Sequence, residues 1–177
     1  MKKILYILIA LFFMTGCTDL SNTPTKQTEA FFKKYQALDK DVINDLNNVD
    51  LSNYNDEQSK LYRDIMKRHY QNLTYEIKEE TVDGDDAVVK VEITVTDFKK
   101  TLDESNEYLN SHIEEFQDEL GNYDESKYID YRLEKLKNAK EKIKYTINIS
   151  LTKINDKWTV DNLTDDMHDK IDGIYNY

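Results

Sequence analysis

The sequence predicts an α+β domain in which a four-stranded antiparallel sheet, made from two hairpins, packs against helices. Three observations support this prediction. Apolar and polar residues alternate over 88–95 and again over 145–152, as in strands with one buried face. Apolar residues recur every three or four positions before and between these stretches, as on amphipathic helices. The resulting order is helix, helix, hairpin, helices, hairpin, which is typical of the α+β class.

The first predicted helix begins at Pro24. Thr23 is a favourable N-cap, and proline suits the first helical position because that position needs no N–H donor. The following apolar residues predict one helix with a single buried stripe. The stripe consists of Phe31, Tyr35, Leu38, Val42 and Leu46. We expect this stripe to form core rather than a ligand groove.

A second helix is expected after a polar loop over 47–54. Asn55 is a suitable N-cap, and Gln58 stands where it completes a capping box. The apolar pattern then continues to about Tyr70. His69 lies at the edge of the apolar face, where we expect a structural histidine rather than a metal or substrate ligand.

The first hairpin is predicted by a change to period two. Tyr75 and Ile77 alternate with polar residues, and Asp83-Gly84 is typical of a tight turn. On the next strand Val89, Val91, Ile93 and Val95 share one face. The acids at 83, 85 and 86 do not have the Gly and Glu spacing of an EF-hand, so a solvated turn is expected rather than a calcium site.

About forty residues, 99–142, separate the two hairpins and are expected to form helices. Thr101–Glu104 matches a capping box for a third helix, with a stripe that runs to Leu120 and a stop at Gly121. Asp124 is expected to cap a fourth helix that ends in a lysine-rich turn. The apolar positions of the two helices are Leu109, Ile113, Phe116, Leu120, Ile129, Leu133 and Leu136. The lysines are Lys135, Lys137, Lys140 and Lys142, and a solvated turn is their expected role.

A second hairpin and an acidic tail complete the chain. Tyr145, Ile147, Ile149 and Leu151 alternate with polar residues, Asn155-Asp156 turns the chain, and Trp158 and Val160 lie on the return strand. At helical spacing the tail places four potential metal ligands on one face. They are Asp165, His168, Asp169 and Asp172. We expect a solvated tail and no metal site.

The first seventeen residues have the pattern of an export leader. Lys2 and Lys3 precede an uncharged apolar run over 4–14, which is shorter than the roughly 20 residues that span a bilayer. Met14-Thr15-Gly16-Cys17 resembles the lipobox of bacterial lipoproteins. The resemblance implies that the Cys17 sulfur carries a diacylglyceryl group and that the chain is cleaved before it. Two acyl chains anchor a protein stably, whereas one does not.

This interpretation divides the chain into a signal peptide (1–16), a lipidated tether (17–24) and one α+β domain (25–177). The predicted location is the extracytoplasmic face of the cell membrane. Loss of Lys2 and Lys3 takes the formal charge from −11 to −13, which disfavours nucleic acid as a partner. Cys17 is the only cysteine, so no disulfide supports the domain. Few Gly and Pro, with abundant Lys, Asn, Ile and Tyr, favour a low-GC, Gram-positive source.

The hairpin residues resemble the NTF2-like and cystatin-like domains of small Gram-positive lipoproteins. The resemblance lies in Tyr75–Ile77, Asp83–Ala87, Val88–Val95 with Asp97, and Trp158–Val160. It implies a sheet that curves around a concave pocket able to hold a small apolar ligand or a partner segment. Tyr75, Tyr145 and Trp158 are the candidate lining residues, although core packing is the more ordinary role for each. The long 99–142 insertion argues against a closed, cone-shaped pocket.

Three functions are consistent with the sequence. The preferred one is a non-enzymatic binding or interaction module that takes a small apolar ligand or an envelope protein and needs no cofactor. The second is an NTF2-like isomerase or hydrolase, but His69, His112 and His168 are dispersed and no nucleophile or metal motif is present. Glu115 follows His112 by three residues, which a surface pair on a helix explains. The third is a helical partner-binding surface, for self-association, in 99–142.

Overall fold

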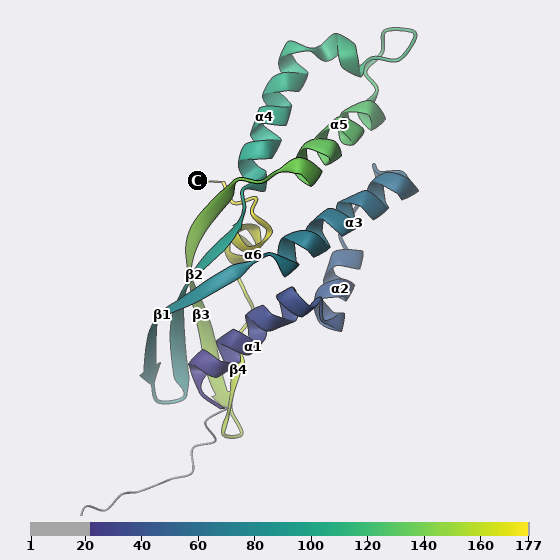
Figure 1. Cartoon of the computed structure of the whole chain (residues 1–177). Helices are drawn as coiled ribbons and strands as arrows, with labels where there is room; N and C mark the ends of the chain where they lie inside the picture. The colour runs from purple at the N-terminus through teal and green to yellow at the C-terminus, as the bar shows by residue number, and fades with distance from the viewer. Residues whose placement is uncertain (1–21, 177) are drawn as a thin grey trace, which may run out of the picture.

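A meander of four antiparallel strands organises the domain, and helices cover one of its faces (Figure 1). The structure is a computed structural model and describes residues 22–176. The leader and Cys17 lie outside these residues. In chain order the elements are α1 (Pro24–Ala37), α2 (Lys40–Asn47), α3 (Asp56–Gln71), β1 (Thr74–Asp83), β2 (Asp86–Thr96), α4 (Phe98–Ser111), the short 3-10 helix η1 (Ile113–Phe116), α5 (Glu125–Asn138), β3 (Lys142–Ile154), β4 (Lys157–Val160) and α6 (Asp165–Asp172).

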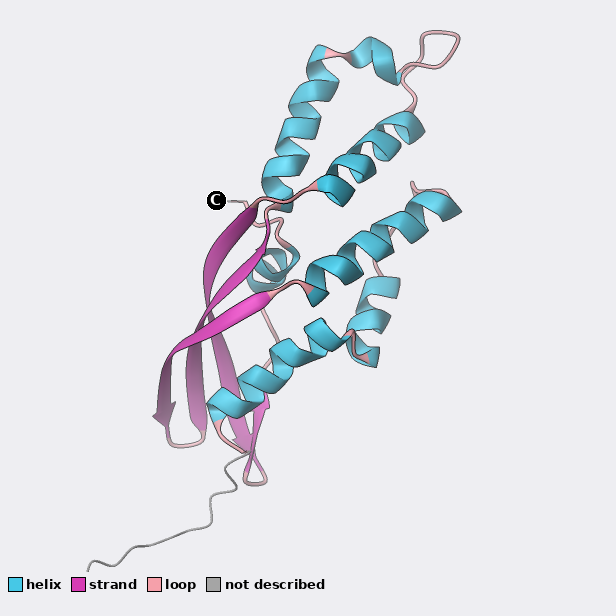
Figure 2. Ribbon diagram, in the orientation of Figure 1, coloured by secondary structure: helices cyan, strands magenta, loops and turns pink. Residues whose placement is uncertain are grey.

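The strand order is β1-β2-β3-β4, with each neighbouring pair antiparallel. The hairpins β1–β2 and β3–β4 are joined by α4, η1 and α5, which project beyond the end of the sheet (Figure 2). The predicted α+β class, the two hairpins and the helical insertion between them are therefore confirmed. None of the described helices is long and apolar enough to cross a membrane.

The core forms between α1, α3, α6 and one face of β2 and β3. The register pairs Val89 with Ile149 and Val91 with Ile147, and all four side chains are buried. Because strand side chains alternate between faces, the polar residues between them lie on the solvent side. The predicted alternation is thus confirmed on both central strands. Phe32 from α1 packs into this layer and is fully buried.

The predicted single helix through Leu46 is wrong, because the chain breaks at Leu38. Leu38 has φ 53° and ψ 51°, and the N–H groups of residues 38 and 39 donate to the carbonyls of Tyr35 and Lys34. These two hydrogen bonds close α1 in a Schellman motif. Asp39 then caps α2 by accepting from Asp41 N. The left-handed conformation costs a non-glycine residue roughly 1–2 kcal/mol, so the sequence gives little sign of the break.

The third helix also differs from the prediction. It begins at Phe98, and Asp97 is its N-cap, accepting from Lys100 N at 3.0 Å. Asp97 competes successfully with Thr101 because the buried Phe98 ring must point into the core. The helix ends at Ser111, and the chain turns back on itself before α5. Leu120, predicted to be on the buried stripe, is 86% exposed on this turn. Asp124, in contrast, caps α5 as predicted.

The acidic tail is not solvated as expected. It forms α6, capped by Thr164 and closed by Gly173 at φ 74°. Ile171 of this helix is fully buried, and the Asp172 carboxylate accepts a 2.8 Å hydrogen bond from the Tyr70 hydroxyl. Ile171 can dock because the acids at the start of the helix, Asp165 and Asp166, are exposed, while Asp172 enters the buried side as the hydrogen-bond partner of Tyr70.

Candidate functional site

A groove of about 670 Å³ lies outside the core, between α1 and the chain that leaves β4. Its apolar lining comes from Phe31 and Tyr35 on one wall and from Trp158, Val160 and Leu163 on the other. Polar side chains are as numerous in the lining, and they include Lys34, Asp45, Asp161 and His168. We call this pocket the α1–β4 groove. A concave surface that combines aromatic side chains with polar groups is typical of ligand sites.

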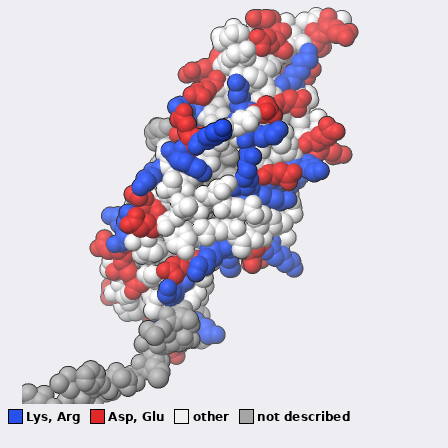
Figure 3. All heavy atoms as spheres, in the orientation of Figure 1, with Lys and Arg blue, Asp and Glu red and all other residues white. Residues whose placement is uncertain are grey.

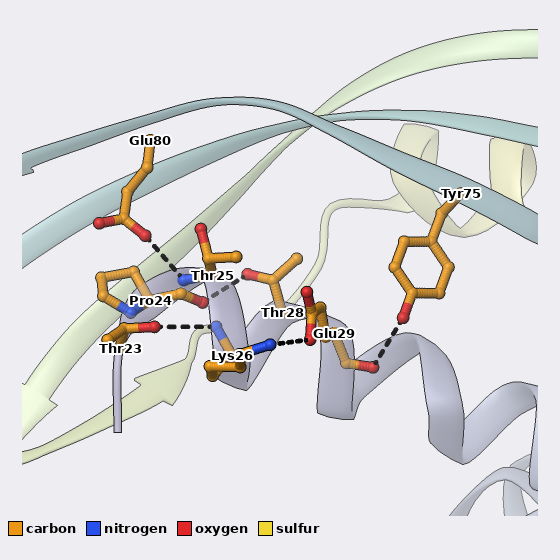
Figure 4. Close-up of polar contacts among 8 residues, drawn as sticks. All are labelled: Thr23, Pro24, Thr25, Lys26, Thr28, Glu29, Tyr75 and Glu80. Carbon is orange, nitrogen blue, oxygen red and sulfur yellow. Dashed lines mark hydrogen bonds and ion pairs between the residues drawn. The ribbon is translucent and has the colours of Figure 1, made fainter. Parts of the chain in front are cut away.

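Local contacts hold α1 in place beside the sheet. Thr23 caps the helix by accepting from Lys26 N, and the Glu80 carboxylate of β1 accepts from Thr25 N at 2.9 Å (Figure 4). The buried Thr28 hydroxyl donates to the carbonyl of Pro24 within the first turn. Since these contacts and Phe32 fix the inner side of α1, its other side is left to line the groove.

The second wall is held by the start of the folded chain. Asn22 accepts a 3.0 Å hydrogen bond from Trp158 N and donates to the carbonyl of Asp156 in the β3–β4 turn. These two bonds hold β4 against the segment that enters α1. Residues 22–24, placed in the tether by the sequence, therefore take part in the fold. Trp158 remains half-buried, with its indole on the groove.

The three predicted lining residues do not come together. Trp158 lines the groove, but Tyr75 stacks on Phe32 with ring centroids 4.9 Å apart. Tyr145 is buried and meets the edge of Tyr175 at 5.8 Å. The space between α1 and the sheet, where a cone-shaped pocket would lie, is filled by core side chains. Phe31 and Tyr35, expected in the core, pack against its edge and also line the groove, since the fully buried position on α1 belongs to Phe32.

A cluster of tyrosines around one carboxylate adjoins the inner end of the groove. Asp172, Tyr35 and Tyr70 line a cavity of about 150 Å³, together with Asp45 and His168. Burial raises the pKa of Asp172 from 3.8 to about 6, although the Tyr70 hydrogen bond opposes the shift. Burial and the nearby Asp172 raise the pKa values of Tyr35 and Tyr70 well above their ordinary range. The tyrosines are therefore neutral hydrogen-bonding groups, and Asp172 changes charge near neutral pH.

The histidines do not form acid–base pairs in the described part of the chain. His69 is buried, with Nε2 2.8 Å from the carbonyl of Ile171, as expected of a structural histidine. His112 ends α4 and stacks on Tyr108, and it is Tyr108 rather than His112 that pairs with Glu115. None of the three histidines hydrogen-bonds a carboxylate within residues 22–176. The same residues contain no cluster of His, Cys, Asp and Glu arranged to hold a metal.

The groove residues missed by sequence reasoning have a weak signal in the sequence. Adjacent aromatic residues on a helix point about 100° apart, so only one of Phe31 and Phe32 can lie at the centre of the core, and Phe31 packs at its edge. Asp172 has a similar signal, because it follows Ile171 on a helix that must bury at least one residue to dock. Neither pattern predicts which surface of the protein Phe31 or Asp172 contacts.

Comparison with known proteins supplies little more. No family model and no curated protein matches the chain. A solved structure of a "putative lipoprotein" (ycdA) from Bacillus subtilis subsp. subtilis str. 168 aligns over 85% of this chain at 11% identity, with a TM-score of 0.45. The aligned part is 47% of that protein, so this chain spans about half its length.

Proposed function

We propose that the chain is an extracytoplasmic lipoprotein, anchored through Cys17, whose domain binds an apolar ligand or partner segment in the α1–β4 groove without catalysing a reaction. The α1–β4 groove is the observation that supports the proposed binding function. It brings Phe31 and Tyr35 of α1 within one pocket with Trp158, 120 or more positions later in the chain. The meander with one long helix on its face supports the resemblance to NTF2-like and cystatin-like domains, which stays part of the proposal.

The groove position is compatible with the proposed anchor. The described chain begins at Asn22, beside the β3–β4 turn (Figure 1). Asn22 stands five positions after Cys17, so the two are at most about 17 Å apart at roughly 3.3 Å per residue. In the proposed orientation the end of the sheet that holds the β3–β4 turn lies near the membrane. The segment formed by α4, η1 and α5, which we call the helical hairpin, points away from it.

Replacing Cys17 with Ala tests the anchor. Without the thiol no diacylglyceryl group can be attached, and we expect the protein to leave the membrane fraction or to keep its leader. The measurement is fractionation of a lipoprotein-processing host, followed by the intact mass of the protein. A Cys17→Ala protein that stays in the membrane at the mature mass would contradict the proposed lipid anchor.

The groove is tested through Trp158, the only tryptophan of the chain. Nile red, a neutral apolar probe, is expected to bind there and to reduce the Trp158 emission by contact with the indole. Phe31→Ala is expected to weaken binding about 10- to 150-fold, because burial of a phenyl ring contributes roughly 1.5–3 kcal/mol. Leu120→Ala is the matched control, since Leu120 is an exposed apolar residue on the distant helical hairpin. Equal affinities for the two variants would exclude the groove as the probe site.

A partner surface on the helical hairpin is less well supported. Three apolar side chains, Ile113, Leu120 and Tyr123, are exposed around its tip. The same segment carries Glu114, Glu115, Asp118 and Glu119. Two copies that met there would bring like charges together, so self-association through the tip is disfavoured. We therefore prefer the groove.

A further inference from the structure

A second pocket, of about 340 Å³, lies at the opposite end of the sheet from Asn22. It is bounded by the end of α3, the end of α5 and the first residue of β3. The inner part of its lining is buried and includes His69, Thr96 and Phe98. Its outer part is formed by three basic side chains, Arg68, Lys140 and Lys142. We call it the basic pocket.

The charge of this pocket is opposite to that of the protein. The chain has a formal charge of −11, yet no carboxylate is among the described residues that line the pocket. Within residues 22–176 none of its three cations forms an ion pair, because the neighbouring Glu141 pairs with Lys100. Figure 3 shows basic side chains gathered at mid-height of the molecule, around the junction of α5 and β3.

Two of the cations are held in place by neutral groups. The Lys142 ammonium donates to the Thr96 hydroxyl at 3.1 Å, and the Arg68 guanidinium donates to the carbonyl of Lys137. Partial burial lowers the pKa of Lys142 below its ordinary value. An anion in the pocket would raise this pKa again, because opposite charges favour each other's ionised form.

His69 closes the inner end of the pocket without offering a ligand contact. A carbonyl oxygen only accepts, so the 2.8 Å contact with Ile171 O places the proton on Nε2. Nδ1 is enclosed by the protein, and a ligand in the pocket does not reach it. The three cations are therefore the groups that select the charge of a ligand.

We propose that the basic pocket binds a small, doubly charged oxyanion, namely inorganic phosphate or a phosphate monoester. Lys140, Lys142 and Arg68 neutralise its oxygens. A phosphodiester carries one negative charge where a monoester carries about two at neutral pH. The pocket is therefore expected to bind diesters more weakly.

The position of the pocket favours a soluble phosphate over a lipid headgroup. β3 runs from Lys142 at the pocket to Ile154 beside the Asn22 end. Thirteen residues at about 3.3 Å each make this strand roughly 40 Å long. In the proposed orientation the anchor holds the Asn22 end at the membrane. The glycerophospholipid headgroups of that surface are also mostly diesters, which carry a single negative charge on the phosphate.

Calorimetric titration of the full-length protein in a neutral detergent tests the proposal. We expect one phosphate site, sulfate binding of similar affinity, dimethyl phosphate binding at least tenfold weaker, and no binding of Cys17→Ala protein to phosphatidylglycerol vesicles. Lys140→Ala with Lys142→Ala is expected to weaken phosphate binding by about 100-fold, or tenfold for each charge-assisted contact. Lys90→Ala, which removes an exposed charge from β2, is the control and is expected to bind phosphate normally.

Two outcomes of the anion titrations would overturn the proposal. One is equal affinity for phosphate and dimethyl phosphate, and the other is phosphate binding that survives the double substitution. Vesicle binding in place of phosphate binding would overturn it in favour of a lipid surface. Nile red binding in the groove is expected to be unaffected, so the two proposals fail independently.

Discussion

Gly173→Ala is expected to lower the free energy of unfolding by about 2–5 kcal/mol. Gly173 closes α6 at φ 74°, and its carbonyl accepts from Lys99 N at 2.8 Å. A β-carbon there would overlap the carbonyl oxygen of Thr96 and stand 3.0 Å from Cε1 of His69. Left-handed backbone costs an alanine roughly 1–2 kcal/mol, and overpacking adds roughly 1–3 kcal/mol. Denaturant unfolding measures the loss.

Gly84→Ala separates the two contributions. Gly84 also has a positive φ, 62°, but a β-carbon there meets no atom within 4 Å. We expect this variant to lose only the backbone contribution, about 1–2 kcal/mol. Equal losses at the two glycines would mean that α6 moves away from Thr96 without cost. That result would also show that α6 is not rigidly docked.

Asp172→Asn is expected to change how stability depends on pH. Burial raises the folded-state pKa of Asp172 from 3.8 to about 6, so between these values the folded protein holds a proton that the unfolded chain has lost. Its contribution to stability is therefore present below about pH 4 and lost as the pH rises through 6. Relative to the wild type, the variant is expected to gain about 1–3 kcal/mol between pH 4 and 7, since one pKa unit corresponds to about 1.4 kcal/mol.

His69 has the opposite effect on stability over nearly the same range. Burial lowers the folded-state pKa of His69 from 6.5 to about 4, so the unfolded chain binds its proton first on acidification. The contribution of neutral His69 to the free energy of unfolding is fully present above about pH 6.5 and is lost as the pH falls to 4. In the wild type these two changes largely offset each other. In Asp172→Asn the His69 effect is expected to appear as a loss of stability on acidification.

Urea unfolding at pH 4, 5, 6, 7 and 8 tests this pair of shifts. The difference between the variant and wild-type curves isolates Asp172, because all other groups are common to both. Asp166→Asn is the control, as it removes an exposed carboxylate from the same helix. Parallel curves for Asp172→Asn and the wild type would show that Asp172 titrates in the folded protein as it does in the unfolded chain.

Sequence reasoning was most successful where a local pattern has one physical meaning. The alternation over 88–95 predicts which side of β2 is buried, and the Asn55–Gln58 spacing predicts a capping box that the structure contains. It was least successful where two local signals compete. Thr101 and Asp97 are both plausible caps, and only the burial of Phe98 decides for Asp97.

For the candidate sites as well, the sequence predicts local features but not which distant residues meet. Trp158 was identified as a possible lining residue, but Phe31 and Tyr35 were assigned to the core. Lys140 and Lys142 were noted as a cluster and Arg68 was not, since it lies about seventy positions earlier in the chain. No periodic pattern links residues that far apart.

By itself, the sequence determined the acidic charge, the α+β class and the buried faces of the central strands, and it predicts an export leader with a lipidation site at Cys17. Each of these depends on composition or on spacings of a few residues. Only the tertiary structure decided that α6 docks, that the groove lies outside α1 rather than inside the sheet, and that three cations meet beside His69. These depend on which distant surfaces pack together, and that is determined by the volume and burial of whole side chains such as Phe32 and Ile171 rather than by local spacing.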